Sequence, residues 1–260
     1  MIIKKIVIIN ILFMIFFSSY AMAAQNWKEN RSRHFIIYYK NAPKEFIKAV
    51  EESAEGYYYS IVKDLGFSRD QLWTWDDRAQ IYIYDNEDDY LVSSRQAGWS
   101  SASTRIGSRA IQTYPAAHGF FDSLLPHELG HIIFREYVGV SSDLPLWVDE
   151  GVAMYQEKAK RWGADDEVRK AIAENRFIPL SELGRTRLTS ATDREVVNLF
   201  YAESASVIRY LITEHGAFKF LNFCQNLKKG LRFEDALEKA YYRFQTIDDL
   251  NKAWMGYLKK

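Results

Sequence analysis

The chain has one cysteine and 5 prolines in 260 residues, and it lacks repeats, low-complexity segments and proline-rich linkers. A single cysteine excludes an intrachain disulfide. Cys224 stands in an apolar, helix-like stretch, which favours a buried and unreactive side chain. The fold must therefore depend on its packed core, and an aromatic content of 15% supplies large side chains for it.

The chain also has no excess of either charge, because 34 Lys and Arg balance 34 Asp and Glu. A surface that binds nucleic acid needs concentrated Lys and Arg, so we expect no nucleic-acid partner. Beyond the N-terminus, no apolar run approaches the 18 or so residues of a membrane-spanning helix. We therefore expect no stable membrane span in the mature chain.

The N-terminus has the features of an export signal. Lys4 and Lys5 precede an apolar stretch over residues 6–17, and Ala21-Met22-Ala23 fits a cleavage site with small residues. We expect residues 1–23 to be a signal peptide and the mature chain to be periplasmic or secreted. The alternative is an uncleaved membrane anchor.

Two histidines four residues apart carry the strongest chemical signal. His127 and His131 lie in a segment with apolar residues at helical spacing. Positions i and i+4 share one helix face, so both imidazoles can point at one Zn²⁺. Glu128 is rotated off that direction, where it can act on a water as general base; this is the H-E-x-x-H pattern. The alternative is an ordinary half-buried helix whose polar residues bind no metal.

A second motif follows, and 18 residues separate its glutamate, Glu150, from His131. Here the chain resembles the gluzincin branch of the zinc metallopeptidases, and more narrowly the peptidase MA-like proteins, with their W-x-x-E-G-x-A pattern. Trp147, Glu150, Gly151 and Ala153 match that pattern. The resemblance implies that Glu150 is the third zinc ligand. Three protein ligands with one open position are typical of catalytic zinc sites.

The resemblance also implies roles for further residues. Zinc would lower the pKa of a water, and Glu128 would take its proton and pass it to the leaving amine. Tyr201 opens a segment similar to a family helix and is the expected oxyanion donor. The alternative for Tyr201 is a core tyrosine, and Tyr210 is then the substitute.

The order of predicted elements indicates an α+β fold of zincin-like type. We expect a small N-terminal β-sheet with helices, packed on a mainly helical C-terminal half, with the metal cleft between them. Residues 24–260 would form one catalytic domain, with a β-bearing lobe over 24–119 and a helical lobe over 120–260. The pattern predicts strands at 35–39, 81–84 and 109–114, a solvated acidic turn at 85–89, and helices at 43–65, 123–138, 145–160, 165–175, 200–215, 217–228, 233–240 and 247–258.

The strand before the metal helix receives a role from the resemblance alone. In zinc peptidases of this architecture, that strand lies at the sheet edge beside the cleft. We therefore expect an extended substrate to pair with Ala110, Ile111, Gln112, Thr113 and Tyr114. The alternative is an edge strand that binds nothing.

These features predict an exported zinc endopeptidase that acts on peptide or protein substrates. The chain lacks the Gly-x-Met-Glu-Asn segment with which aminopeptidases bind a free amino terminus, so exopeptidase action is doubtful. Two alternatives remain open: a peptidase-like binding protein without turnover, and a zinc hydrolase of some non-peptide amide. A general base beside the first ligand favours an enzyme.

Overall fold

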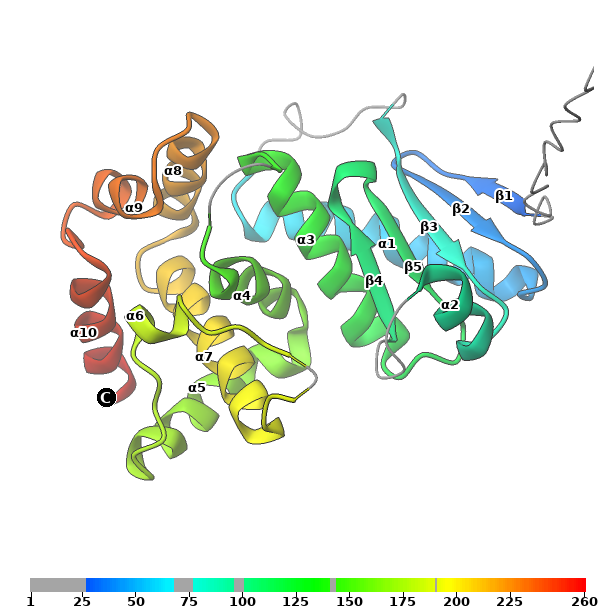
Figure 1. Ribbon diagram of the computed structural model, residues 1–260. Coiled ribbons are helices and arrows are strands. Elements are labelled where there is room, and N and C mark those ends of the chain that lie inside the picture. Colours follow the sequence, from blue (N-terminus) through cyan, green and yellow to red (C-terminus); the bar gives the residue numbers. More distant parts are fainter. Residues whose placement is uncertain (1–26, 68–76, 96–100, 141–143, 190) are drawn as a thin grey trace, which may run out of the picture.

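The computed structural model describes residues 27–67, 77–95, 101–140, 144–189 and 191–260. A five-stranded sheet forms the N-terminal part and helices dominate the rest, so the predicted α+β class is confirmed (Figure 1). Within this part of the chain no helix is long and apolar enough to cross a membrane. The predicted signal peptide, residues 1–23, lies outside the described residues, and the division into two lobes stays a prediction.

The sheet has the strand order β1-β2-β3-β5-β4. Its strands are β1 (Lys28–Arg31), β2 (Phe35–Tyr39), β3 (Ala79–Ile83), β4 (Ala102–Arg105) and β5 (Ala110–Thr113). The central strands β2, β3 and β5 run parallel, while β1 and β4 are antiparallel to their neighbours. In β3 every second residue is fully buried, and in β2 Phe35 and Ile37 are, as expected for strands that place one face on a core. Helix α1 (Lys44–Asp64) lies across the sheet (Figure 1).

The strand predicted around Ala110–Tyr114 forms, but the prediction that it lies at the sheet edge is wrong. Ile111 of β5 is paired with Ile81 of β3 on one side and with Thr104 of β4 on the other. All four residues of β5 are buried, so an extended substrate cannot add to this strand. The edge strand on this side of the sheet is β4, and the other edge is β1. The β4 sequence Ala-Ser-Thr-Arg gives only a weak strand pattern, and the segment forms a strand because it pairs with β5.

The acidic segment at residues 85–89 is exposed over residues 85–88, as predicted, but it is not a turn throughout. Helix α2 (Glu87–Ser94) begins there, and the Asn86 side chain caps it by accepting a hydrogen bond from the backbone N–H of Asp89. The acidic residues occupy the first turn, where the helix dipole favours negative charge. Asp89 also pairs with Lys40 at 2.6 Å.

The remaining helices are α3 (Leu125–Val138), α4 (Leu146–Gln156), α5 (Lys158–Ala173), α6 (Leu180–Leu183), α7 (Arg194–Thr213), α8 (Ala217–Lys228), α9 (Phe233–Tyr241) and α10 (Ile247–Leu258). They follow the predicted order, except that the short helix α6 was not predicted; α8 and α10 have the predicted ends and the ends of the others are shifted. Helix α3 lies between the sheet and the helical part (Figure 1). Helix α4 packs closely on α7 because Gly151 has no side chain: a Cβ there would stand 2.4 Å from the carbonyl oxygen of Ser204. Cys224 is buried in α8, as predicted.

A buried carboxyl on α7 should make stability depend on pH. Glu203 is fully buried; its Oε1 accepts a hydrogen bond from the backbone N–H of Ile178 at 2.9 Å, and Oε2 has no partner among the described residues. Burial raises the pKa of Glu203 to about 8. The folded chain therefore keeps a proton that the unfolded chain releases above its ordinary pKa of 4.5.

We expect the free energy of unfolding to fall as pH rises from about 4.5 to about 8, by up to roughly 1.4 kcal/mol per pH unit from this group. Glu203→Gln keeps an uncharged group at the position and should remove this component. Urea unfolding of both proteins at pH 5, 7 and 9 measures it, since other groups titrate equally in the two proteins. If the free energy of unfolding changes with pH by the same amount in wild type and variant, Glu203 is not the group responsible.

Candidate metal centre

Two consecutive long helices bring the three predicted ligands together. His127 and His131 come from α3, and Glu150 comes from α4. The Nε2 atoms of both histidines lie 3.6 Å from the Glu150 Oε2 atom and 3.2 Å from each other. All three ligand atoms fall within 4.8 Å of one another, so one metal ion can contact them all.

Helix α3 begins without a side-chain cap. Gly119, at φ 65°, turns the chain into a short π-helical segment, Phe120–Leu124, which leads directly into α3. Ser123 in this segment donates its hydroxyl hydrogen bond to Glu157. Pro126 stands in the first turn of α3, where its missing N–H costs little, and Gly139 ends the helix. The N-cap residue of α4 is Pro145.

Each histidine has a carboxylate at its other ring nitrogen. His127 Nδ1 lies 2.9 Å from Glu157 Oε1, and His131 Nδ1 lies 3.4 Å from Asp149 Oδ1. A carboxylate at Nδ1 favours the tautomer with a proton there and a lone pair on Nε2. The two Nε2 lone pairs then face each other at 3.2 Å, which is unfavourable unless a cation lies between them. The residues present therefore fit a bound metal ion.

The charge around the site points the same way. Four carboxylates, those of Glu128, Asp149, Glu150 and Glu157, surround the imidazole pair. Burial lowers the pKa of His127, but the nearby carboxylate of Glu150, the hydrogen bond to Glu157 and the charge of Glu128 outweigh burial and raise it to about 10. Arg135 pairs with Asp149 at 3.2 Å, which leaves three carboxylates around the imidazole pair whose charge a divalent metal ion would balance.

The predicted helix over residues 145–160 ends early because of Glu157. Helix α4 stops at Gln156, and Glu157 takes a non-helical conformation at ψ 88° before α5 begins. Its buried carboxylate contacts both His127 and Ser123. The sequence pattern missed this residue, since a Glu between Gln156 and Lys158 resembles an exposed helix position.

The predicted base, Glu128, faces a threonine of the edge strand. The Thr104 hydroxyl donates a hydrogen bond of 2.5 Å to Glu128 Oε2. Thr104 belongs to β4, so the sheet edge and the metal helix meet at this carboxylate. Sequence reasoning missed Thr104, which carries no local signal of its role.

A cleft of about 830 Å³ opens over these residues. Its walls include β4, α3, α4 and α7, together with the exposed His118, which the sequence did not single out. Tyr201 lines this cleft; burial and the charges of Glu150, Glu128 and Glu157 raise the pKa of its hydroxyl.

Tyr210 lies elsewhere. Its ring stands 5.0 Å from that of His215 and 5.2 Å from that of Tyr257, and it does not line the cleft. Residues 110–114, which were expected to bind the substrate, do not line the cleft either.

Removal of the Glu150 carboxylate, the predicted third ligand, should weaken metal binding strongly. Glu150→Ala is expected to weaken zinc binding by more than about 100-fold, because the loss of a direct ligand exceeds the effect of losing an outer partner. Zinc affinity, measured by competition with a chromophoric chelator, checks this. Glu167→Ala removes an exposed carboxylate that lines the same cleft and should leave the affinity unchanged. Equal affinities in both variants would exclude Glu150 as a ligand.

Comparison with known proteins places the chain in a family. A family model described as the peptidase MA superfamily matches residues 74–260, most of the chain. The matched segment contains β3 to β5, both ligand helices and Tyr201. No curated protein matches the chain significantly. The chain therefore belongs to the peptidase MA superfamily, whose peptidases are metal-dependent.

Proposed function

We propose that the chain is a zinc-dependent endopeptidase. The observation that carries the proposal is the convergence of His127, His131 and Glu150, with the Glu128 carboxylate in the same cleft. Two imidazoles and one carboxylate are a donor set that suits Zn²⁺, as in other catalytic sites with three protein ligands. When bound there, zinc supplies Lewis acidity that lowers the pKa of water and polarises a carbonyl.

The residues around the cleft supply the proton transfers. Glu128 takes a proton from the attacking water and gives it to the leaving amine. Thr104 holds one carboxylate oxygen of Glu128 at 2.5 Å, which leaves the other oxygen for the water. Tyr201 keeps its proton because its pKa is raised, so its hydroxyl is a donor for the oxyanion of the tetrahedral intermediate.

In this proposal strand β4 takes the substrate-binding role that the family resemblance implied for residues 110–114. It is the edge strand on this side of the sheet, and Ala102, Ser103 and Thr104 line the cleft. An extended peptide can pair with the free backbone groups of an edge strand, which places its amide beside Glu128. This edge favours a peptide over a non-peptide amide as substrate. The base at Glu128 favours an enzyme over a binding protein.

The test is a digest of an unbiased peptide library by the zinc-loaded mature chain, with new termini read by mass spectrometry. We expect cleavage at internal bonds, which a chelator abolishes and zinc restores. Products that lose only terminal residues would replace the endopeptidase with an exopeptidase. No cleavage by zinc-loaded protein would favour the binding protein. Export is part of the proposal, and the mature N-terminus after expression tests it.

Removal of the hydroxyl group should distinguish the role of Tyr201 from that of Tyr210. Tyr201→Phe is expected to lower kcat by about 10²- to 10³-fold, the typical cost of removing one oxyanion donor, with zinc content unchanged. Tyr210→Phe is the matched control on the same helix and should keep wild-type kcat, since Tyr210 lies outside the cleft. Initial rates on a cleaved library peptide measure both. A wild-type rate for Tyr201→Phe would assign the oxyanion to another donor.

A further inference from the structure

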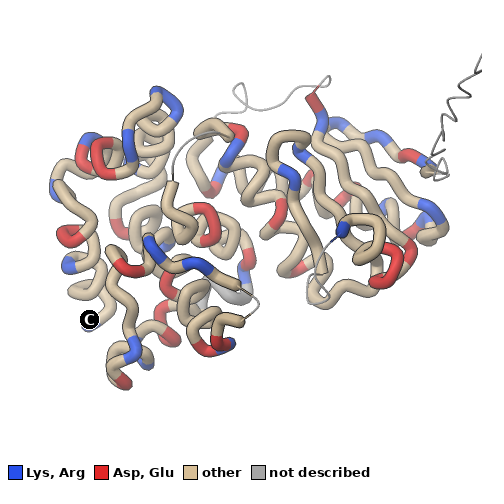
Figure 2. Tube along the Cα trace, viewed as in Figure 1, with Lys and Arg blue, Asp and Glu red and all other residues tan. Residues whose placement is uncertain are grey.

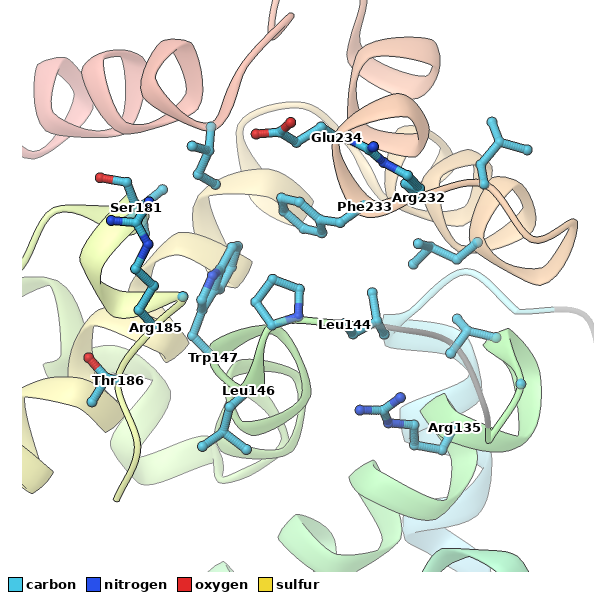
Figure 3. Close-up of a pocket in the computed structure, with 18 of the residues that line it drawn as sticks. Arg135, Leu144, Leu146, Trp147, Ser181, Arg185, Thr186, Arg232, Phe233 and Glu234 are labelled. Carbon is cyan, nitrogen blue, oxygen red and sulfur yellow. The ribbon is translucent and has the colours of Figure 1, made fainter. Parts of the chain in front are cut away.

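A second cavity, of about 1490 Å³, lies in the helical part of the molecule (Figure 3). Its walls come from the end of α3, the start of α4, α6 and the loop after it, the end of α8 and the start of α9. It shares no lining residue with the metal cleft. The volume exceeds the roughly 300–1,000 Å³ of ordinary small-molecule sites, so an extended ligand fits it better than a small one.

The side chains that line this cavity are apolar in its floor and cationic at its rim. Trp147 and Phe233 stand edge to face, 5.6 Å apart, and Leu146 beside them is 39% exposed. One carboxylate, that of Glu234, lines the cavity, and so do five cationic residues: Arg135, Arg185, Arg187, Lys228 and Arg232. Arg135 is paired with Asp149 at 3.2 Å and Arg232 with Asp235 at 3.9 Å, so the positive charge left for a ligand comes from Arg185, Arg187 and Lys228. Figure 2 shows Lys and Arg positions along the loop that follows α6. Such a rim selects a ligand with negative charge.

Hydrogen-bond donors in the cavity also lack acceptors. The Trp147 indole is fully buried, and its Nε1 has no partner among the described residues. In Figure 3 the Trp147 ring lies between Arg185 and Phe233. The side chains of Arg185 and Arg187 likewise form no hydrogen bond or ion pair with another described residue. An unpartnered buried N–H is costly, and an acceptor on a ligand would satisfy it.

Two helix N-termini add to this set of donors. Helices α4 and α9 both begin at the cavity wall, and neither has a side-chain cap. Their first backbone N–H groups and the positive ends of their dipoles favour a negatively charged group. The site therefore offers donors from several separate segments, and a ligand with only one anionic head would satisfy few of them.

We propose that this cavity binds a peptide segment that carries several acidic side chains beside apolar ones. Apolar side chains would rest on Trp147, Phe233 and Leu146, while carboxylates would meet the arginines in the planar geometry that guanidinium groups favour. The backbone carbonyls of the segment are acceptors for Trp147 Nε1. This binding site is separate from the proposed hydrolysis, because it uses none of the residues of the metal cleft.

A fluorescein-labelled peptide of alternating Glu and Leu tests the proposal by fluorescence anisotropy. The Glu128→Gln full-length mature protein is used, so that any cleavage activity is removed. We expect saturable binding that weakens with salt. Peptides with Lys in place of Glu, or with Ser in place of Leu, should bind roughly tenfold more weakly or worse. Because binding and not turnover is measured, the result holds whether or not the chain is a peptidase.

The double variant Arg185→Glu with Arg187→Glu reverses two exposed charges of the rim and should lower the affinity at least about tenfold. Lys44→Glu with Lys63→Glu reverses two exposed charges on α1 and is the matched control, which should bind as before. Circular dichroism confirms that both variants fold. Equal affinity of the rim variant and the control, or no peptide binding at all, would overturn the proposal. Binding only to vesicles of anionic lipid would replace the peptide with a membrane surface.

Discussion

Glu128→Gln is expected to abolish hydrolysis while zinc content and fold stay unchanged. Glutamine has almost the same shape and can still accept the Thr104 hydrogen bond, but it cannot take a proton from water. A positioned general base contributes about 10²- to 10⁴-fold to a rate, so we expect kcat to fall on the order of 10³-fold. Initial rates and metal analysis of the same preparation measure both quantities.

The control for this variant lies two turns further along the same helix. Glu136 pairs with Arg109 at 2.7 Å and does not line the cleft. Glu136→Gln should therefore keep the wild-type rate, although it removes the same charge from α3. If Glu128→Gln retains full turnover with zinc bound, another group must be the base. If it loses zinc as well, Glu128 belongs to the ligand set and not to the proton transfer.

Gly151→Ala should damage both stability and the metal site. The new Cβ would stand 2.4 Å from the Ser204 carbonyl oxygen and 2.7 Å from Ile208 Cγ1. The closest atom belongs to the backbone of α7, so no rotation of a side chain can relieve the clash, and α4 must move away. We expect a loss of about 3 kcal/mol in the free energy of unfolding. Because Glu150 is the preceding residue on α4, zinc affinity should fall in the same variant.

Gly56→Ala provides the matched control. Gly56 lies within α1, and a Cβ there meets nothing within 4 Å. Alanine is the better helix former, so this variant should be as stable as wild type or more stable by up to about 1 kcal/mol. Urea unfolding and zinc competition measure both variants. If Gly151→Ala is as stable as Gly56→Ala, the close contact between α4 and α7 at Gly151 is not needed for stability.

Most of what could be predicted from the sequence came from the spacing of residues within single helices and strands. Histidines at i and i+4 must share a helix face, so the pair at His127 and His131 follows from one helical turn. The α+β class followed from strand-like segments early in the chain and helical periodicity later. Both predictions depend only on neighbours in the sequence.

Contacts between distant segments account for what was missed. Glu157 looked like part of an exposed helix, and only its contact with His127 explains why α4 ends before it. Strand β4 has no aromatic or branched apolar residues, so only its pairing with β5 reveals it. The edge role assigned to residues 110–114 failed for the same reason, because the missed strand covers them.

The end of α4 has a consequence for how this segment tolerates change. Glu150 and Glu157 are separated by seven positions, close to two full turns, so both carboxylates reach His127: Glu150 lies near its Nε2 atom, where the proposed ion would bind, and Glu157 contacts its Nδ1 atom. Insertion or deletion of a single residue between them would rotate one relative to the other by about 100°. The length of this segment is therefore more tightly fixed than its composition, and a one-residue indel should be more harmful than most single replacements there.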